Sequence, residues 1–306
     1  MKELHLRKFL KTWMLPISMM GGIVFHDWIG YLEFLTPYLI FLMLTITYTR
    51  VKPSEFRITR FQWNLLLVQM LGSWIAYCLL LPLSEPLATA AFICIFMPTA
   101  TAAPVVTGML GGSVTKLATY SLLSNLTVAV TAPAFLSIVN DSGRDIPFTD
   151  SFTTICAQVI PLLILPLVVA LLLRYSAPRA HRAIAEHQSI SFWLWAVALF
   201  IVMGRAVSFM IKQPLSELPV MLGMAAASLV VCCLQFIIGR KVGARLGDRI
   251  SGAQGLGQKN TILGIWMALT YLHPLVSIGP AAYIVWQNII NSTQLYLHSR
   301  KHSQID

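Results

Sequence analysis

Residues 252–264 read Gly-Ala-Gln-Gly-Leu-Gly-Gln-Lys-Asn-Thr-Ile-Leu-Gly, and this stretch decides how the rest of the chain is interpreted. It interrupts an apolar segment with glycines, a lysine and several polar side chains. Such a segment at the depth of a bilayer is tolerated only where it is buried in protein or lines a cavity. We therefore expect a broken helix here, with a function for its charged group.

The composition of the whole chain indicates a polytopic membrane protein. Of its 306 residues, 57% are hydrophobic and only 11% are charged, against roughly 25% charged in a soluble domain. Because a transmembrane helix needs roughly 20 apolar residues, the chain has room for about ten of them and for no separate soluble domain. Its five cysteines lie in apolar runs without metal-ligand spacing, which indicates small core residues.

The apolar pattern predicts ten transmembrane spans, the first of them an uncleaved helix that follows a basic N-terminal segment. The predicted spans cover residues about 9–26, 33–50, 61–82, 86–112, 116–139, 151–174, 189–211, 218–238, 250–273 and 276–297.

The distribution of Lys and Arg supports this count. With a cytoplasmic N-terminus, the inner segments hold 18 of the 22 basic residues: Lys2, Arg7, Lys8, Lys11, Arg50, Lys52, Arg57, Arg60, Lys116, Arg174, Arg179, Arg182, Arg240, Lys241, Arg245, Arg249, Arg300 and Lys301. The outer segments hold only Arg144 and Lys212. We therefore expect both termini in the cytoplasm and attribute the net charge of +10 to membrane orientation, not to nucleic-acid binding. The compact chain is typical of a bacterial inner (plasma) membrane protein.

The acidic and histidine residues do not favour an enzyme. All 12 acidic residues lie in loops, in tails or at predicted helix ends, so no carboxylate is expected at the midplane for a proton relay or for hydrolytic chemistry. The seven histidines also lie at ends or in loops without metal spacing. We expect no catalytic residue, no cofactor and no tightly bound metal.

The ten spans divide evenly about residues 140–145. The predicted organisation is a first repeat over residues 1–141, an outer linker over 142–150 and a second repeat over 151–306. Five helices per half would invert the second half, which is a common plan of secondary transporters, with interrupted spans at matching positions marking the site. The fourth span should therefore be broken as the ninth is. It carries Pro98 and Pro104 together with Thr99, Thr101 and Thr107, so it meets this expectation.

Three stretches resemble the bile acid:sodium symporter family: the segment around Pro98, the Ser/Asn/Thr-rich residues 121–133, and residues 257–261, Gly-Gln-Lys-Asn-Thr. The resemblance implies an all-α protein of ten transmembrane helices in two inverted five-helix repeats. Helices 1, 2, 6 and 7 would form a panel domain, and helices 3–5 and 8–10 a core domain in which the broken helices 4 and 9 cross. Two sodium ions would bind behind the crossing, and an organic anion in the cleft between the domains.

The resemblance also assigns individual ligands. Gln69 matches a glutamine that helps to bind one sodium ion, and Ser121 and Asn125, four residues apart on one helix face, match ligands of the other. Asn260 matches an asparagine of the ninth helix. A residual sodium site at Gln69, Ser121, Asn125 and Asn260 therefore stays open.

The departures from the family pattern argue against the standard two-sodium mechanism. An asparagine of the fourth helix falls at Pro104, the glutamate shared by both sodium sites at Gly255, and a glutamine at Lys259. The anionic ligand is thus missing and a cation stands nearby, where like charges repel by several kcal/mol.

Lys259 has a functional and a structural interpretation. In the functional interpretation, its ammonium group takes the place and charge of a sodium ion, or it gains and loses a proton and so couples transport to protons. In the structural interpretation, the lysine is bonded to carbonyl groups that the break frees near Pro98 to Pro104.

We predict a secondary active transporter of an organic anion, bile-acid-like or a small carboxylate, that works by alternating access with Na⁺ or H⁺ as a possible coupling ion. The predicted crossing residues are Gln69, Pro98, Thr99, Thr101, Pro104, Ser121, Asn125, Gln258, Lys259, Asn260 and Thr261. Gln287, Asn291 and Arg205 are possible cleft residues, with interhelical hydrogen bonding and snorkelling as their alternatives. A sodium-coupled symporter with altered sites, an exporter of arsenite or a weak acid, and a non-transporting sensor or scaffold stay open as alternatives. The sequence does not indicate an oligomeric state.

Overall fold

The computed structural model describes residues 17–49, 57–100, 103–140, 148–187 and 189–302. Every regular element in these residues is a helix, so the predicted all-α class is confirmed. The chain divides into two compact units, each built from two separate stretches of sequence. Unit 1 comprises residues 1–50 and 164–215, and unit 2 comprises residues 51–163 and 216–306.

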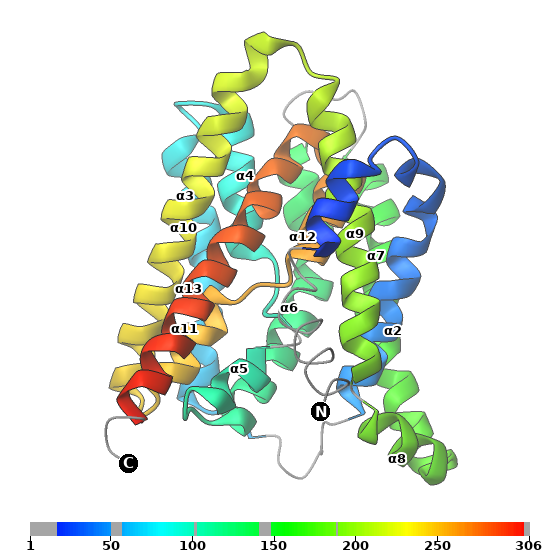
Figure 1. The fold of residues 1–306 in the computed structure, drawn as a ribbon, viewed down its shortest axis with the longest axis vertical. Helices are drawn as coiled ribbons and strands as arrows, with labels where there is room; N and C mark the ends of the chain where they lie inside the picture. Colours follow the sequence, from blue (N-terminus) through cyan, green and yellow to red (C-terminus); the bar gives the residue numbers. More distant parts are fainter. Residues whose placement is uncertain (1–16, 50–56, 101–102, 141–147, 188, 303–306) are drawn as a thin grey trace. The chain divides into compact units, whose positions relative to one another are not determined.

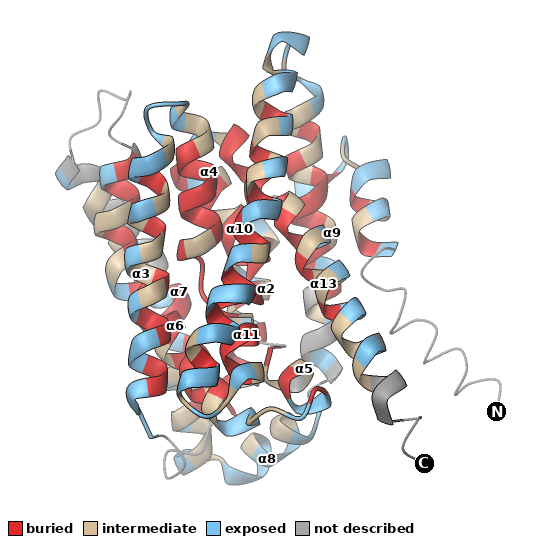
Figure 2. Ribbon diagram, turned by 90° about the vertical axis from the view of Figure 1, so that its left-hand side faces the viewer, coloured by how far each residue is buried: buried red, intermediate tan, exposed pale blue. Residues whose placement is uncertain are grey.

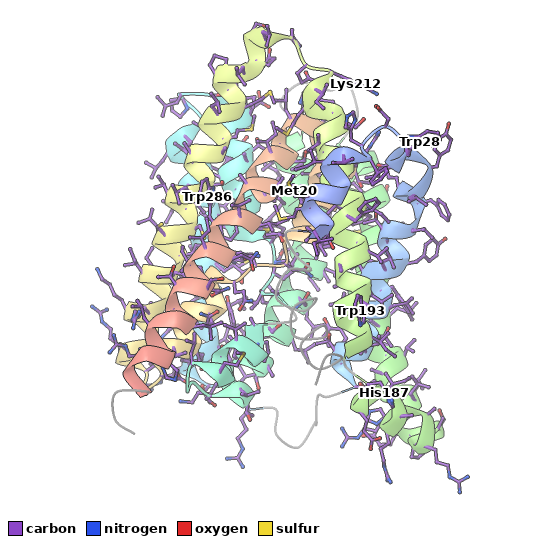
Figure 3. All side chains as sticks on the ribbon, viewed as in Figure 1. Met20, Trp28, His187, Trp193, Lys212 and Trp286 are labelled. Carbon is purple, nitrogen blue, oxygen red and sulfur yellow. The ribbon has the colours of Figure 1, made fainter. Side chains whose placement is uncertain are left out.

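Unit 1 is built from the helical residues 17–24, η1 (Ile29–Leu35), α2 (Thr36–Tyr48), the second part of α7 (Phe148–Ser176), α8 (Pro178–Glu186) and α9 (Ser189–Ile211). Gly22 and Gly204 bring the first of these helices close to α9, because a side chain on either would clash with the partner's backbone. Figure 3 shows Trp28 and Lys212 toward one end of α9 and His187 beyond the other. The sequence interpretation missed α8, which it placed in a loop.

Unit 2 holds the remaining helices: α3 (Arg60–Leu80), α4 (Glu85–Phe96), α5 (Ala103–Met109), α6 (Val114–Asn140), the first part of α7, α10 (Leu218–Arg245), α11 (Arg249–Gly257), α12 (Thr261–Tyr271), η4 (Pro274–Ser277) and α13 (Ile278–His302).

Four helical stretches among the described residues are long and apolar enough to cross a membrane. These are Ile29–Tyr48, Arg60–Leu80, Val114–Val139 and Leu215–Arg245, and four shorter apolar helices accompany them. The chain is therefore a membrane protein. The count of ten spans stays a prediction.

Both predicted breaks are present, and the local sequence explains each. Pro98 disfavours the helical conformation at the residue before it, and Met97 accordingly has φ −50° and ψ 143° at the end of α4. α11 ends at Gly257, and α12 begins at Thr261. The residue before α12, Asn260, caps the helix because its side-chain oxygen accepts a hydrogen bond from the Leu263 backbone N–H at 3.3 Å. In Figure 1 the connection between α11 and α12 runs among the helices of unit 2.

The second broken pair is anchored on α10 and α13. A side chain on Gly239, Gly243 or Gly252 would clash with the backbone of the other helix, so these glycines let α10 and α11 pack in backbone contact. Trp286 of α13 donates from Nε1 to the Ala225 carbonyl of α10 at 3.2 Å. All residues of α11 from Ser251 to Gly257 are buried, as Figure 2 shows. The polar crossing segment of α11 and α12 is therefore held inside unit 2.

Candidate functional site at the crossing of two broken helices

The two breaks meet as a short antiparallel pair of extended residues. Thr99, between α4 and α5, pairs with Lys259, between α11 and α12. The Asn260 N–H donates to the Pro98 carbonyl at 2.8 Å, and the Ala100 N–H donates to the Gln258 carbonyl at 2.9 Å. Backbone groups that the breaks remove from their helices thus satisfy each other, as buried polar groups must in a bilayer.

The side chains of the two central residues repeat this relation. Thr99 Oγ1 donates to the Gly255 carbonyl at 2.8 Å, and Lys259 Nζ donates to the Ile95 carbonyl at 2.8 Å. Each side chain therefore reaches the carbonyl four positions before its partner residue. The contacts of the crossing are related by a local two-fold pattern.

The C-terminal end of α4 is capped entirely by side chains from elsewhere in unit 2. Gln235 Nε2 donates to the Cys94 carbonyl at 3.2 Å, and Lys259 takes the next carbonyl, that of Ile95. Gln69 Nε2 donates to the carbonyls of Phe96 and Met97 at 2.8 and 3.2 Å. These are the carbonyls that a helix end leaves without a partner.

Lys259 supplies a positive charge at the C-terminal end of α4. Its residue is 1% exposed, and none of the ion pairs found between described residues includes it. A cation at a helix C-terminus is stabilised by the negative end of the helix dipole. The acceptor is Ile95, at the end of α4, and not a carbonyl between Pro98 and Pro104, where the structural interpretation of the sequence expected it.

Gln69 is placed at the crossing as predicted, but its carbonyl oxygen has no capacity left for an ion. Oε1 accepts hydrogen bonds from the Tyr120 hydroxyl at 2.7 Å and from Ser124 Oγ at 2.8 Å. An amide oxygen has two lone pairs, and both are used.

Gly255, where the resemblance would place a glutamate, packs against α6. A Cβ atom on Gly255 would lie 3.0 Å from Tyr120 Cδ1 and 3.2 Å from Leu117 Cδ1. Tyr120 is fully buried. A side chain at position 255 would therefore require Tyr120, which also holds Gln69, to shift by a few tenths of an ångström.

The other predicted ligands are buried but not joined into one ion site. Asn125 Nδ2 donates to the Ser121 carbonyl at 2.7 Å, and Asn125 Oδ1 has no hydrogen-bond partner in the described residues. Asn260 uses its side-chain oxygen to cap α12. Among the described residues, no group of three or more His, Cys, Asp or Glu side chains is arranged to hold a metal ion.

The remaining predicted crossing residues fall as follows. Gln258 and Thr261 are buried beside Lys259, Pro98 and Thr99 are buried in the opposite segment, and Pro104 is the partly buried second residue of α5. Thr101 lies outside the described residues.

The predicted cleft residues have other partners. Gln287 Oε1 accepts from the Lys259 N–H at 2.9 Å, and Asn291 Oδ1 accepts from Gln254 Nε2 at 3.1 Å, so both make the interhelical hydrogen bonds named as their alternative. Arg205 belongs to unit 1, where its Nε lies 3.0 Å from Glu33 Oε2. Its assignment to a cleft stays a prediction.

Sequence reasoning missed several residues that build the site. Tyr283 donates to the Gly257 carbonyl at 2.9 Å and accepts from Gln235 Nε2 at 3.0 Å, and Tyr120 and Gln254 have the contacts given above. A polar side chain in the middle of an apolar span, such as Gln235 in Leu-Gln-Phe, was the available signal.

Comparison with known protein families found no family model that matches the chain, and comparison with curated proteins found no significant match.

Proposed function

We propose that the protein is a secondary active transporter of an organic anion, bile-acid-like or a small carboxylate, that works by alternating access without the standard two-sodium coupling. The observation that carries the proposal is the reciprocal crossing of two broken helices inside a membrane protein. Unwound backbone at membrane depth is the usual construction of transporter sites.

The division of the chain supports the proposed repeat organisation. Unit 2 gathers α3 to α6 with α10 to α13, which correspond to the proposed core helices, and unit 1 gathers residues 1–50 with 164–215. Unit 1 differs from the proposed panel only in the first part of α7, which clusters with unit 2. The two-fold pattern of contacts at the crossing is what an inverted repeat would produce at its centre. We further propose ten spans, with both termini on the cytoplasmic side of the inner membrane.

Lys259 is the proposed replacement for a sodium ion. Its ammonium group holds the end of α4 to the crossing, while Gln69 has no free lone pair and Tyr120 packs against Gly255, where the resemblance would place a glutamate. The N-terminal end of α12, which starts at the crossing, adds a positive dipole end for an anion. Sodium coupling through Gln69 is disfavoured by the same contacts.

Flux measurements in proteoliposomes test the function. Uptake of labelled taurocholate and of a panel of small carboxylates is measured under an imposed sodium gradient, potassium gradient or pH gradient. We expect protein-dependent uptake that does not need sodium and that Lys259→Gln abolishes or uncouples. Lys241→Gln, a matched change of an exposed lysine on α10, should transport as the parent does.

Two results would contradict the proposal. Uptake that requires sodium would favour a sodium-coupled symporter with altered sites. No uptake of any anion by a folded protein, together with tolerance of substitutions at the crossing, would favour a sensor or scaffold.

A further inference from the structure

Five amide side chains lie along α11 and its extension and along one face of α13. Gln254 and Gln258 are four residues apart along α11 and its extension, and Gln287, Asn291 and Gln294 share one face of α13. Gln254 Nε2 joins the two sides by donating to Asn291 Oδ1 at 3.1 Å and to Gln294 Oε1 at 3.0 Å. We call these five residues the amide seam.

The seam holds buried polar atoms that the described residues do not satisfy. Gln254 Oε1, Gln258 Oε1 and Asn291 Nδ2 have no hydrogen-bond partner among those residues, although all three residues are more than nine-tenths buried. Buried amide groups almost always have a partner. Three such atoms within two adjacent helices therefore indicate a ligand.

Exchanging the amide ends does not remove the mismatch. Gln254 Nε2 already donates to two oxygens, so turning the Gln254 amide would place its own oxygen against both of them. Turning Asn291 and Gln294 as well would satisfy Gln254 Oε1 but would leave Gln254 Nε2 without an acceptor. The seam keeps unpaired donors and acceptors in either assignment.

The unpaired atoms determine which hydrogen-bonding groups the ligand must carry. It must donate to the two glutamine oxygens and accept from Asn291 Nδ2, so it carries both functions. A cation would meet the Asn291 donor, and an anion would meet two acceptor oxygens. A small neutral molecule with both functions, namely water, fits a polar site of this kind.

The seam runs from the edge of unit 2 to the backbone of Lys259. Gln294, near the C-terminal end of α13, is partly exposed, and Gln287 at the other end accepts from the Lys259 backbone N–H. In the predicted orientation the C-terminus is cytoplasmic, so the exposed end of the seam lies on the inner side. The titratable groups around the crossing are thiols and phenols, namely Cys94 on α4, Cys232 on α10, Tyr120 on α6 and Tyr283 on α13, and no carboxylate among the described residues pairs with Lys259.

We propose that the amide seam is a hydrated site whose water reaches it from the inner aqueous side at Gln294. The side of the membrane to which the seam opens rests on the proposed orientation. The hydration of the seam does not.

Cysteine labelling tests the hydration of the seam directly. In a background with the five natural cysteines replaced by alanine, Gln254→Cys, Asn291→Cys and the control Leu256→Cys are treated with hydroxyethyl methanethiosulfonate. The thiolate attacks the sulfenyl sulfur, forms a mixed disulfide and releases methanesulfinate. Leu256 is equally buried on α11 but lies on the opposite face of that helix from Gln254. Because the reaction needs a thiolate in contact with water, we expect the seam cysteines to react at least about tenfold faster than the control.

A second measurement uses the unmodified protein. Hydroxyl radicals generated from internal water should oxidise Tyr283, which shares the seam face of α13 one turn before Gln287, more than Phe92 in the aromatic cluster of α4. Seam cysteines as slow as Leu256→Cys, together with Tyr283 labelled no more than Phe92, would overturn the proposal. Because neither measurement involves flux, fast labelling of a protein that transports no anion would overturn the transporter proposal and leave the hydrated seam in place.

Discussion

The buried amide side chains on the two flanks of the crossing differ in how fully they are hydrogen-bonded. On the side of α3 and α6, Gln69 uses its nitrogen for two carbonyls and its oxygen for two hydroxyl groups. On the side of α11 and α13, Gln254 uses only its nitrogen, and its oxygen has no partner among the described residues. A satisfied amide fixes structure, whereas an unsatisfied one leaves capacity for a ligand. The first flank is therefore a scaffold, and the second is where small molecules should enter.

The strongest way to break this comparison is to force a carboxylate into the scaffold side. Gly255→Glu should overpack against Tyr120, at a cost of about 1–3 kcal/mol, and should also bury a carboxylate at a cost of several kcal/mol more. We expect failure to fold or a large fall in the thermal midpoint in detergent. If the clash is the cause, Tyr120→Ala should be less costly in the Gly255→Glu background than in the parent. A stable Gly255→Glu variant would show that Tyr120 and α6 can move to accommodate the added side chain.

Removing one amide from each flank gives the next largest effect. Gln69→Leu leaves the Phe96 and Met97 carbonyls without partners, at about 1–3 kcal/mol each. Gln254→Leu removes an oxygen that has no partner among the described residues and a donor to two oxygens, so it should cost less. Thermal unfolding of both variants should therefore show the larger loss for Gln69→Leu. Equal losses would remove the distinction between the flanks.

Lys259 lies between the two flanks, and its replacement tests whether its ammonium group takes the place of a sodium ion. Lys259→Ala leaves the Ile95 carbonyl unpaired and should cost about 1–3 kcal/mol. Stability is titrated with sodium against potassium or choline at constant ionic strength, with Lys241→Ala as the control. We expect no selective sodium effect in the parent and a gain of stability with sodium in Lys259→Ala, because a bound ion would replace the lost cation. Selective stabilisation of the parent by sodium would contradict the replacement of sodium by lysine.

The smallest effect is expected at Asp248, which precedes α11 outside the predicted spans. Partial burial raises the pKa of Asp248, but hydrogen bonds from Ser251 and Ser113 and the nearby charge of Lys116 together outweigh this and lower it. A lowered pKa means stabilisation that is present above the ordinary pKa and lost only as pH falls through the lower folded value. Asp248→Ala should therefore cost about 1 kcal/mol as a lost helix cap, by a constant amount between pH 5 and 9. A pH-dependent difference in that window would contradict this assignment.

The sequence predicted the breaks because prolines and glycines act locally. Pro98 ends α4 and Gly257 ends α11 within their own segments, so both appeared at the expected positions. Gln69, Gln258 and Lys259 were identified as site residues because a polar side chain in an apolar span is costly and conspicuous. The partners of these residues were not predictable, since Ile95, Tyr120 and Gln287 are separated from them by many residues and only packing brings them together.

By itself, the sequence determined that this is an all-α membrane protein with two interrupted segments and a single lysine in the second of them. Composition, proline and glycine positions act over a few residues, and so they can be interpreted without a fold. Only the tertiary structure decided that Lys259 caps α4, that Gln69 is saturated and that Gln254 is not. Those outcomes depend on which groups lie within about 3 Å of each other, and hydrogen-bond satisfaction at that range is set by packing between distant segments.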